Sequence, residues 1–174
     1  MAPEQKSELA ETLEKSRQDL HAAVEAIGES DARTKPGEGR WSVLECVEHV
    51  AVAERRFLGR LEGATRQDSP SIDPQREAHV SAVVTDRGRR LQAPEPVQPS
   101  GRFASVAEAL ADFDATRAQV ARFAEAHHSE LRALAAQHPL FGQVTGYELM
   151  LIIAGHACRH AAQIRETRAA LAGA

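Results

Sequence analysis

The most informative spacing in the sequence is a pair of histidines, His156 and His160, one helical turn apart. At about 100° per residue, both fall on the apolar arc of a helix. The same arc carries Leu149, Ile152, Ile153, Ile164 and Thr167. An imidazole is costly to bury unless both ring nitrogens have partners, and residues four apart on a helix project in parallel. The pair therefore predicts two ligands of one metal ion, with hydrogen-bonded core histidines as the alternative.

A third metal ligand must come from another segment, and His49 is the best-placed histidine. It lies two turns after a helix-start signal at Ser42, at the edge of an apolar arc that suits a pocket opening between two helices. Three neutral imidazoles leave positions on a divalent ion open for water or substrate, as in catalytic sites. Zn²⁺ and Ni²⁺ are the favoured ions, although imidazole also suits iron and copper. The remaining histidines are weaker candidates, because from their spacing any of them could be solvated: His21, His79, His127, His128 and His138.

Two polar residues near these histidines are candidate catalytic groups. Glu45 lies one turn before His49 and could orient a ligand histidine, although it also completes a helix capping box. Gln163 shares the inward face of the histidine pair and could bind a water or the substrate, or satisfy a backbone group. Arg159 is expected on a solvated helix face, with anion binding at a pocket rim as the alternative. Ala157 replaces the glutamate of an H-E-x-x-H motif, which argues against a metalloprotease mechanism.

The elements that must position these residues are long helices separated by prolines, since proline breaks a helix interior. The first predicted helix has apolar residues at helical spacing from Leu9 to Ile27 and ends at Gly28. Capping boxes at Ser42, Ser105 and Thr145 predict three further helix starts. The second helix is expected to reach the insert at Gly63, the third to end near Ala135, and the fourth to run almost to the C-terminus.

A long insert, residues 63–103, separates the second and third predicted helices. Asp73 followed by Pro74 predicts the start of a short helix that ends near Gly88. The proline-rich stretch 93–99 should be extended. Connections of this length are often functional or act as a cover. The predicted fold is all-α: a single domain, residues 1–174, built as a four-helix bundle with a long crossover insert.

Composition restricts the partners and the location of the protein. The formal net charge is −4 and the pI is about 6.1, which gives no reason to expect nucleic acid or an anionic membrane. The longest apolar stretch, Leu149 to Cys158, is half of the roughly 20 residues that a membrane span needs. The N-terminus does not resemble a signal peptide, and the two cysteines form no C-x-x-C motif. We therefore expect a cytoplasmic protein with a small-molecule substrate. The sequence is also compatible with a homodimer formed through exposed helix faces.

Together these motifs resemble the DinB/YfiT-like superfamily of bacterial metalloenzymes. The matching elements are W-S-x-x-E-x-x-x-H, which begins at Trp41, and H-x-x-R-H-x-x-Q-I, which begins at His156. The proline-rich crossover and the Phe113…Arg117 spacing support the match, which covers nearly the whole chain. The resemblance implies a four-helix bundle with a three-histidine metal site, carried here by His49, His156 and His160. Members often have an acidic or polar residue where this chain has Ala157, which puts a proton-relay role at that position in doubt.

The resemblance also bears on activity, because some superfamily members transfer a low-molecular-weight thiol such as bacillithiol or mycothiol, or isomerise a substrate with its help. The leading hypothesis is a metal-dependent enzyme, either a thiol S-transferase or a hydrolase, with such a thiol as a candidate co-substrate. One alternative is a metal- or small-ligand-binding protein without turnover. The other is a helical interaction module whose interior histidines are structural.

Overall fold

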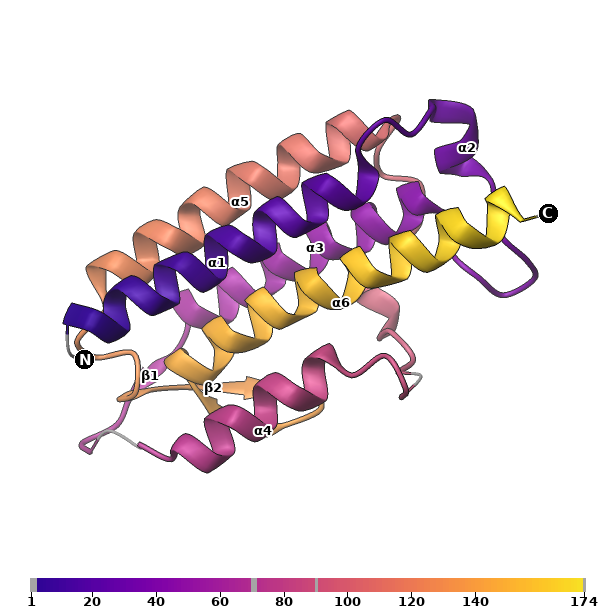
Figure 1. Ribbon diagram of the computed structural model, residues 1–174. Helices are drawn as coiled ribbons and strands as arrows, with labels where there is room; N and C mark the ends of the chain where they lie inside the picture. Colours follow the sequence, from indigo (N-terminus) through magenta and orange to yellow (C-terminus); the bar gives the residue numbers. More distant parts are fainter. Residues whose placement is uncertain (1–2, 70–71, 90, 174) are drawn as a thin grey trace.

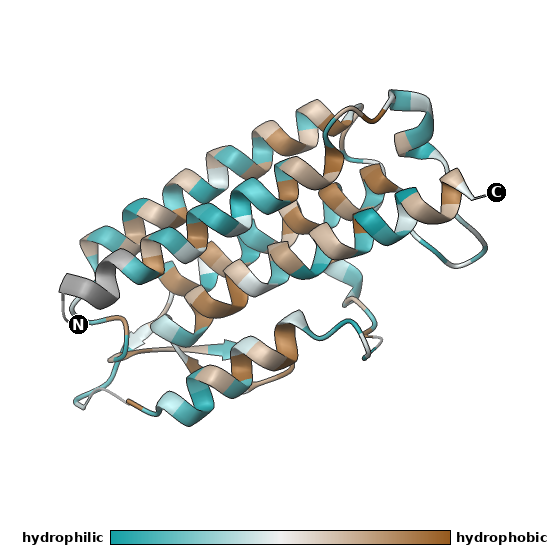
Figure 2. Ribbon diagram, in the orientation of Figure 1, coloured by the Kyte–Doolittle hydropathy of each residue, from teal (hydrophilic) through white to brown (hydrophobic). Residues whose placement is uncertain are grey.

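The computed structural model describes residues 3–69, 72–89 and 91–173. Four long helices form the bundle (Figure 1): α1 (Pro3–Val24), α3 (Val43–Glu62), α5 (Val106–Ala126) and α6 (Gly146–Ala172). Helices α1 and α3 each pack against both α5 and α6, so each long helix has two long neighbours. Figure 2 shows hydrophobic residues gathered where these helices face one another. The predicted four-helix bundle is confirmed.

The helix starts follow the capping signals in the sequence. Ser42 and Thr145 each accept a hydrogen bond from the backbone N–H of the glutamate three residues later, and that glutamate accepts one from the backbone N–H of the cap residue. At Ser105 only the first bond forms, because the carboxylate of Glu108 accepts from the N–H of Ala104 instead. These bonds satisfy amides that have no partner within the helix. They fix where α3 and α6 begin, and so the positions along both helices of the three histidines predicted as ligands.

The insert contains the predicted short helix, α4 (Pro74–Thr85), which begins at Asp73 and lies along the outside of α6 (Figure 1). Its close approach depends on Gly155, because a Cβ atom there would overlap the side chain of Val84. After α4 the chain returns through a 3-10 turn, η1 (Glu95–Val97), which contacts α3. The insert therefore covers both helices that carry the candidate ligands.

Two predicted boundaries were wrong. The third long helix, α5, ends at Ala126 instead of near Ala135, and the alanine-rich segment after it forms β2 (Leu134–His138). Strand β2 pairs antiparallel with β1 (Thr65–Arg66) and with β3 (Gly142–Thr145), giving the order β1-β2-β3. The first helix ends at Val24 because Ala26 adopts a left-handed φ of 58°. A short helix, α2 (Glu29–Arg33), follows in the segment expected to be turns.

The core consists of two apolar clusters with buried polar groups among their helices. One cluster lies toward the sheet and includes Leu13, Leu61 and Ile153, while the other includes Val47 and Phe113. The buried polar side chains include those of Glu48, His49, Glu54, Arg117, Arg159 and His160. Within the described ranges, no helix combines the length and apolar composition that crossing a membrane requires.

Candidate metal centre

The three predicted ligands converge on one point between α3 and α6. His49 comes from α3 and His156 and His160 come from α6, and one ring nitrogen of each lies within 4.8 Å of the others. The Nε2 atoms of His49 and His156 are 3.1 Å apart. His49 and His160 are buried, and His156 is of intermediate exposure. His49 and His156 are 107 residues apart in sequence, and the packing of α3 against α6 brings the three imidazoles together, as the sequence pattern predicted.

The orientation of His49 is fixed by the crossover. Its Nδ1 lies 2.7 Å from the backbone carbonyl oxygen of Val97 in η1. A carbonyl oxygen only accepts hydrogen bonds, so the proton of the neutral ring is on Nδ1 and the lone pair is on Nε2. A backbone carbonyl that orients a ligand histidine in this way is common around metal ions. Nε2 of His49 is therefore prepared to ligate.

His160 supplies a direct test of whether a metal ion fits. Its Nδ1 is buried, and within the described part of the chain it has no hydrogen-bond partner. Such a nitrogen costs roughly 1–3 kcal/mol if nothing binds it. Zinc–nitrogen bonds of about 2.0–2.1 Å in tetrahedral geometry place two ligand atoms about 3.3 Å apart, close to the separation of the His49 and His156 nitrogens. The donor set fits a divalent ion.

Burial also sets the protonation state that a ligand needs. Loss of solvation lowers the pKa of His49 below its ordinary value of 6.5, although the bond to Val97 acts in the opposite direction. Loss of solvation, followed by the neighbouring histidines, places the pKa values of His156 and His160 well below 6.5. All three rings are therefore neutral at pH 7, and a metal ion has no proton to displace from them.

Aromatic side chains surround the cluster. The Trp41 ring lies 4.8 Å from that of His49, and the edge of Phe57 meets His156 at 5.7 Å between ring centroids. Phe57 also stacks on His138, from strand β2, at 5.7 Å. These rings place apolar surface against His49 and His156, and a less polar surrounding strengthens electrostatic interactions there.

The two candidate catalytic residues lie beside the cluster but have other partners. The carboxylate of Glu45 accepts from the N–H of Ser42 at 2.8 Å and pairs with Lys35 at 2.8 Å. The side-chain oxygen of Gln163 accepts from Arg87 at 3.4 Å. The capping role of Glu45 is confirmed, while the catalytic roles of Glu45 and Gln163 stay predictions.

The sequence interpretation placed one residue wrongly and missed another. Arg159 is only 6% exposed, and instead of facing solvent it donates to the backbone carbonyls of Asp86 and Arg89 in the insert. Glu48 is 1% exposed and accepts hydrogen bonds from the crossover. No local signal could have found Glu48, because at about 100° per residue it lies well off the apolar arc of Val43 and Val47 and is buried by the crossover.

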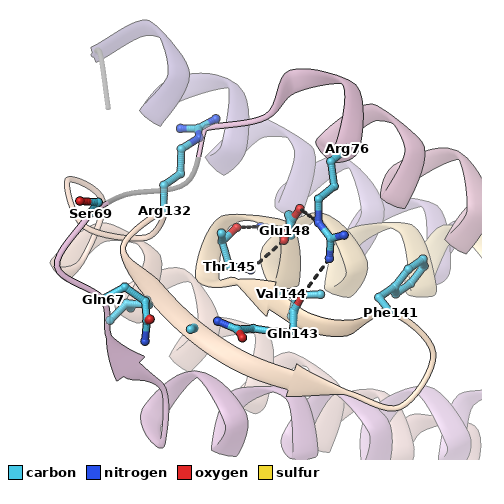
Figure 3. A pocket seen from close by; sticks show the side chains of 11 residues that line it. Gln67, Ser69, Arg76, Arg132, Phe141, Gln143, Val144, Thr145 and Glu148 are labelled. Carbon is cyan, nitrogen blue, oxygen red and sulfur yellow. Dashed lines mark hydrogen bonds and ion pairs between the residues drawn. The ribbon is translucent and has the colours of Figure 1, made fainter.

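A separate pocket of about 370 Å³ lies at the sheet, where β3 leads into α6 (Figure 3). Its arginines are already paired: Arg76 with the buried carboxylate of Glu148 at 2.7 Å, and Arg132 with Glu77 at 2.7 Å. Arg76 also donates to the carbonyl of Gln143 at 2.8 Å. None of the three clustered histidines lines this pocket, so it is distinct from the candidate metal centre.

Comparison with known proteins places these observations in a family. The sequence model of the DinB superfamily matches residues 12–164. The uncharacterized protein YuaE of Bacillus subtilis is 22% identical over 145 residues, which span 83% of this chain and 88% of YuaE. The protein GK0616 of Geobacillus kaustophilus, named provisionally as a metal-dependent hydrolase, is 24% identical over 158 residues, which span 86% of this chain and 76% of that protein.

Two solved structures share the fold. YfiT from Bacillus subtilis, described provisionally as a metal-dependent hydrolase with an unusual four-helix bundle topology, superimposes with a TM-score of 0.67 at 20% identity. That match covers 99% of this chain and 90% of YfiT. The four-helix bundle protein TT2238 gives a TM-score of 0.58 at 20% identity, covering 92% of this chain and 98% of TT2238. At such low identity the structural matches establish the bundle alone.

Proposed function

The chain belongs to the DinB superfamily, and on that premise we propose that it is a metal-dependent enzyme whose divalent ion is held by His49, His156 and His160. The observation that carries the proposal is the convergence of three neutral imidazoles, one of which has a buried nitrogen without a partner. An imidazole buried with an unpaired nitrogen is unfavourable in a closed apolar core, and a cation shared with two other imidazoles would offset that cost. The names of GK0616 and YfiT support the same class of chemistry.

Hydrolysis is the reaction class we favour, with thiol S-transfer as its close variant. A divalent ion supplies Lewis acidity, which makes water or a low-molecular-weight thiol a better nucleophile at neutral pH. The chain contributes the orientation of His49 through Val97, and the aromatic walls formed by Trp41 and Phe57. Glu45 and Gln163 are the residues we propose for handling a proton or binding the substrate. The substrate would be a small molecule, and the proposed location is the cytoplasm.

The second candidate function is metal or small-ligand binding without turnover. It is favoured by the contacts of Glu45, whose carboxylate caps α3 and pairs with Lys35. Among the described residues, no carboxylate is hydrogen-bonded to a ligand histidine. Zinc-loaded protein can be screened for ester and amide hydrolysis and for thiol conjugation. Activity that is lost on chelation and restored by metal supports the enzyme, while complete inactivity of loaded protein supports the binding protein.

The metal site itself is tested by elemental analysis of the purified protein and by titration with Zn²⁺ at neutral pH. We expect one ion per chain, and a His160→Ala variant should lose it. His138→Ala is the matched control, because His138 is a nearby histidine outside the ligand set and should be dispensable for binding. A wild-type chain without affinity for Zn²⁺ or Ni²⁺ would refute the proposal, and a His160→Ala variant with full metal content would refute the ligand assignment.

A further inference from the structure

Glu48 is one of the most deeply buried charged residues of the protein, at 1% exposure. Its carboxylate accepts hydrogen bonds from the backbone N–H of Ser100 at 2.7 Å and of Gly101 at 3.1 Å. The guanidinium of Arg102 donates to it at 3.1 Å. Three donors thus come from consecutive residues of the crossover, and they compensate the cost of burying the charge.

The neighbouring residue on α3, His49, holds the same stretch of crossover through the carbonyl of Val97. Consecutive residues of α3 therefore fasten the crossover at two points, from Val97 to Arg102. Helix α6 shows the same arrangement, because Arg159, which precedes the ligand His160, donates to the carbonyls of Asp86 and Arg89. A residue adjacent to a ligand histidine anchors the insert on each of the two helices that build the metal centre.

We propose that Glu48 is a positioning residue for the metal centre: by fixing residues 100–102 it keeps the Val97 carbonyl on His49 Nδ1 and so keeps Nε2 free to ligate. The inference rests on the proposed metal binding. A neutral imidazole carries its proton on one nitrogen only, so losing the Val97 acceptor lets the proton move to Nε2 and removes the lone pair. Metal binding and order in the crossover are then coupled, and the coupling is reciprocal.

The decisive variant is Glu48→Gln, which keeps the size of the side chain but replaces one acceptor oxygen by an amide that cannot accept. Zn²⁺ affinity, measured by competition with a chromophoric chelator, should fall about tenfold or more, as it does for other residues that orient ligands. The ¹⁵N shifts of the His49 ring should change from the Nδ1–H form toward a mixture of tautomers. Amide hydrogen exchange in residues 93–102 should become faster, and Zn²⁺ should slow it in the wild type.

Glu77→Gln is the matched control. Glu77 also joins the insert to another part of the chain, because its carboxylate accepts two hydrogen bonds from Arg132. In the described part of the chain it has no hydrogen bond to the three histidines or to the residues next to them. The same chemical change there should leave Zn²⁺ affinity and the His49 tautomer unchanged. If Glu77→Gln weakens Zn²⁺ binding as much as Glu48→Gln does, general loosening of the insert explains the effect and the proposal is overturned.

A folded Glu48→Gln variant with wild-type Zn²⁺ affinity and an unchanged His49 tautomer also overturns the proposal. If that variant does not fold, Arg102→Met decides, because the methionine side chain has no N–H and so removes one of the three donors, at a partly exposed position. This variant should weaken Zn²⁺ binding, although by less than Glu48→Gln does. Wild-type Zn²⁺ affinity in this variant would count against the proposal. If the wild type binds no metal, the proposed function fails, whereas the His49 tautomer in metal-free wild type and variant still tests the positioning role.

Discussion

Two buried polar groups inside the bundle differ in how completely their atoms are paired. The first is the centre around Arg117, which binds the carboxylate of Glu54, the carbonyl of Leu13 and the hydroxyl of Ser16. The second is the histidine cluster, in which the Nδ1 atom of His160 has no partner among the described residues. Both join helices far apart in sequence, and both lie beside apolar clusters. Only the first is satisfied by the chain itself.

This difference in pairing indicates a structural role for the Arg117 centre and a functional role for the histidine cluster. Arg117 connects α5 to α3 and α1 through hydrogen bonds that compensate its burial. The histidines gain no comparable compensation, because they are neutral and, within the described part of the chain, only His49 has a backbone acceptor. A buried polar atom without a partner calls for an explanation, and beside two further imidazoles a bound ion is the one we favour. The two centres should therefore respond differently to the same kinds of perturbation.

The largest expected effect is at the first centre. Arg117→Met leaves the carboxylate of Glu54 buried without its cation, and losing one partner of a buried ion pair costs about 3–5 kcal/mol. Urea unfolding of the metal-free protein measures this change. Zn²⁺ affinity, measured in the folded fraction, should stay the same. A double variant, Arg117→Met with Glu54→Leu, should recover most of the stability, and failure to do so would contradict the assignment of the loss to an unpaired charge.

At the histidine centre, replacing His160 should change the stability that bound Zn²⁺ adds to the protein. His160→Leu removes the unpaired nitrogen, so the metal-free protein should be as stable as the wild type or more stable by about 1 kcal/mol. The wild type should gain about 2.7 kcal/mol at Zn²⁺ concentrations 100 times Kd, and the variant should gain none. Thermal unfolding with and without Zn²⁺ measures both. A large loss of stability in the metal-free variant would instead indicate that His160 is a structural core residue.

Acidification should affect the histidine centre next. Burial holds the pKa values of His156 and His160 well below 6.5 in the folded protein, while in the unfolded chain they return to about 6.5. Below pH 6.5 the unfolded chain binds more protons, so the stability of the metal-free protein falls as pH falls. Both rings contribute to this loss, which should begin near pH 6.5 and grow as the pH falls further. A flat profile in urea unfolding would contradict this, and His160→Leu should reduce the slope without abolishing it, because the lowered pKa values of His49, His138 and His156 still contribute.

Local sequence signals predicted where the long helices begin. Contacts between distant segments explain why strand β2 was not predicted. Capping residues at Ser42 and Thr145 bind amides three residues away, so the sequence alone reveals them. Strand β2 has no such signal, because the alanines at its centre suit a helix as well as a strand. It is a strand because it pairs with β1, some 70 residues earlier, and with β3 across a turn where Gly142 has a φ of 68°.

The three clustered histidines were predictable as candidate ligands, but their supporting residues were not. One-turn spacing on an apolar arc identified His156 and His160, and His49 was the best-placed histidine elsewhere, two turns after the Ser42 cap and at the edge of a second apolar arc. The arc suggested a rim position for His49, yet it is only 4% exposed because the crossover covers it. Glu54 lies at the centre of that arc, where a charge signals a buried partner, but no local pattern names Arg117 as that partner. Such contacts depend on how the helices pack.

The smallest predicted effect concerns Glu45, whose capping bond and proposed catalytic role are separable. Glu45→Gln keeps an oxygen that can accept from the N–H of Ser42, and glutamine serves in capping boxes. The free energy of unfolding should therefore change by only a few tenths of a kcal/mol, as expected for losing the surface pair with Lys35. Zn²⁺ affinity should be unchanged, because no hydrogen bond joins Glu45 to His49.

If the loaded enzyme loses most of its turnover in this variant while stability and metal content are kept, Glu45 acts as a proton carrier. If turnover is kept, its role is confined to the start of α3.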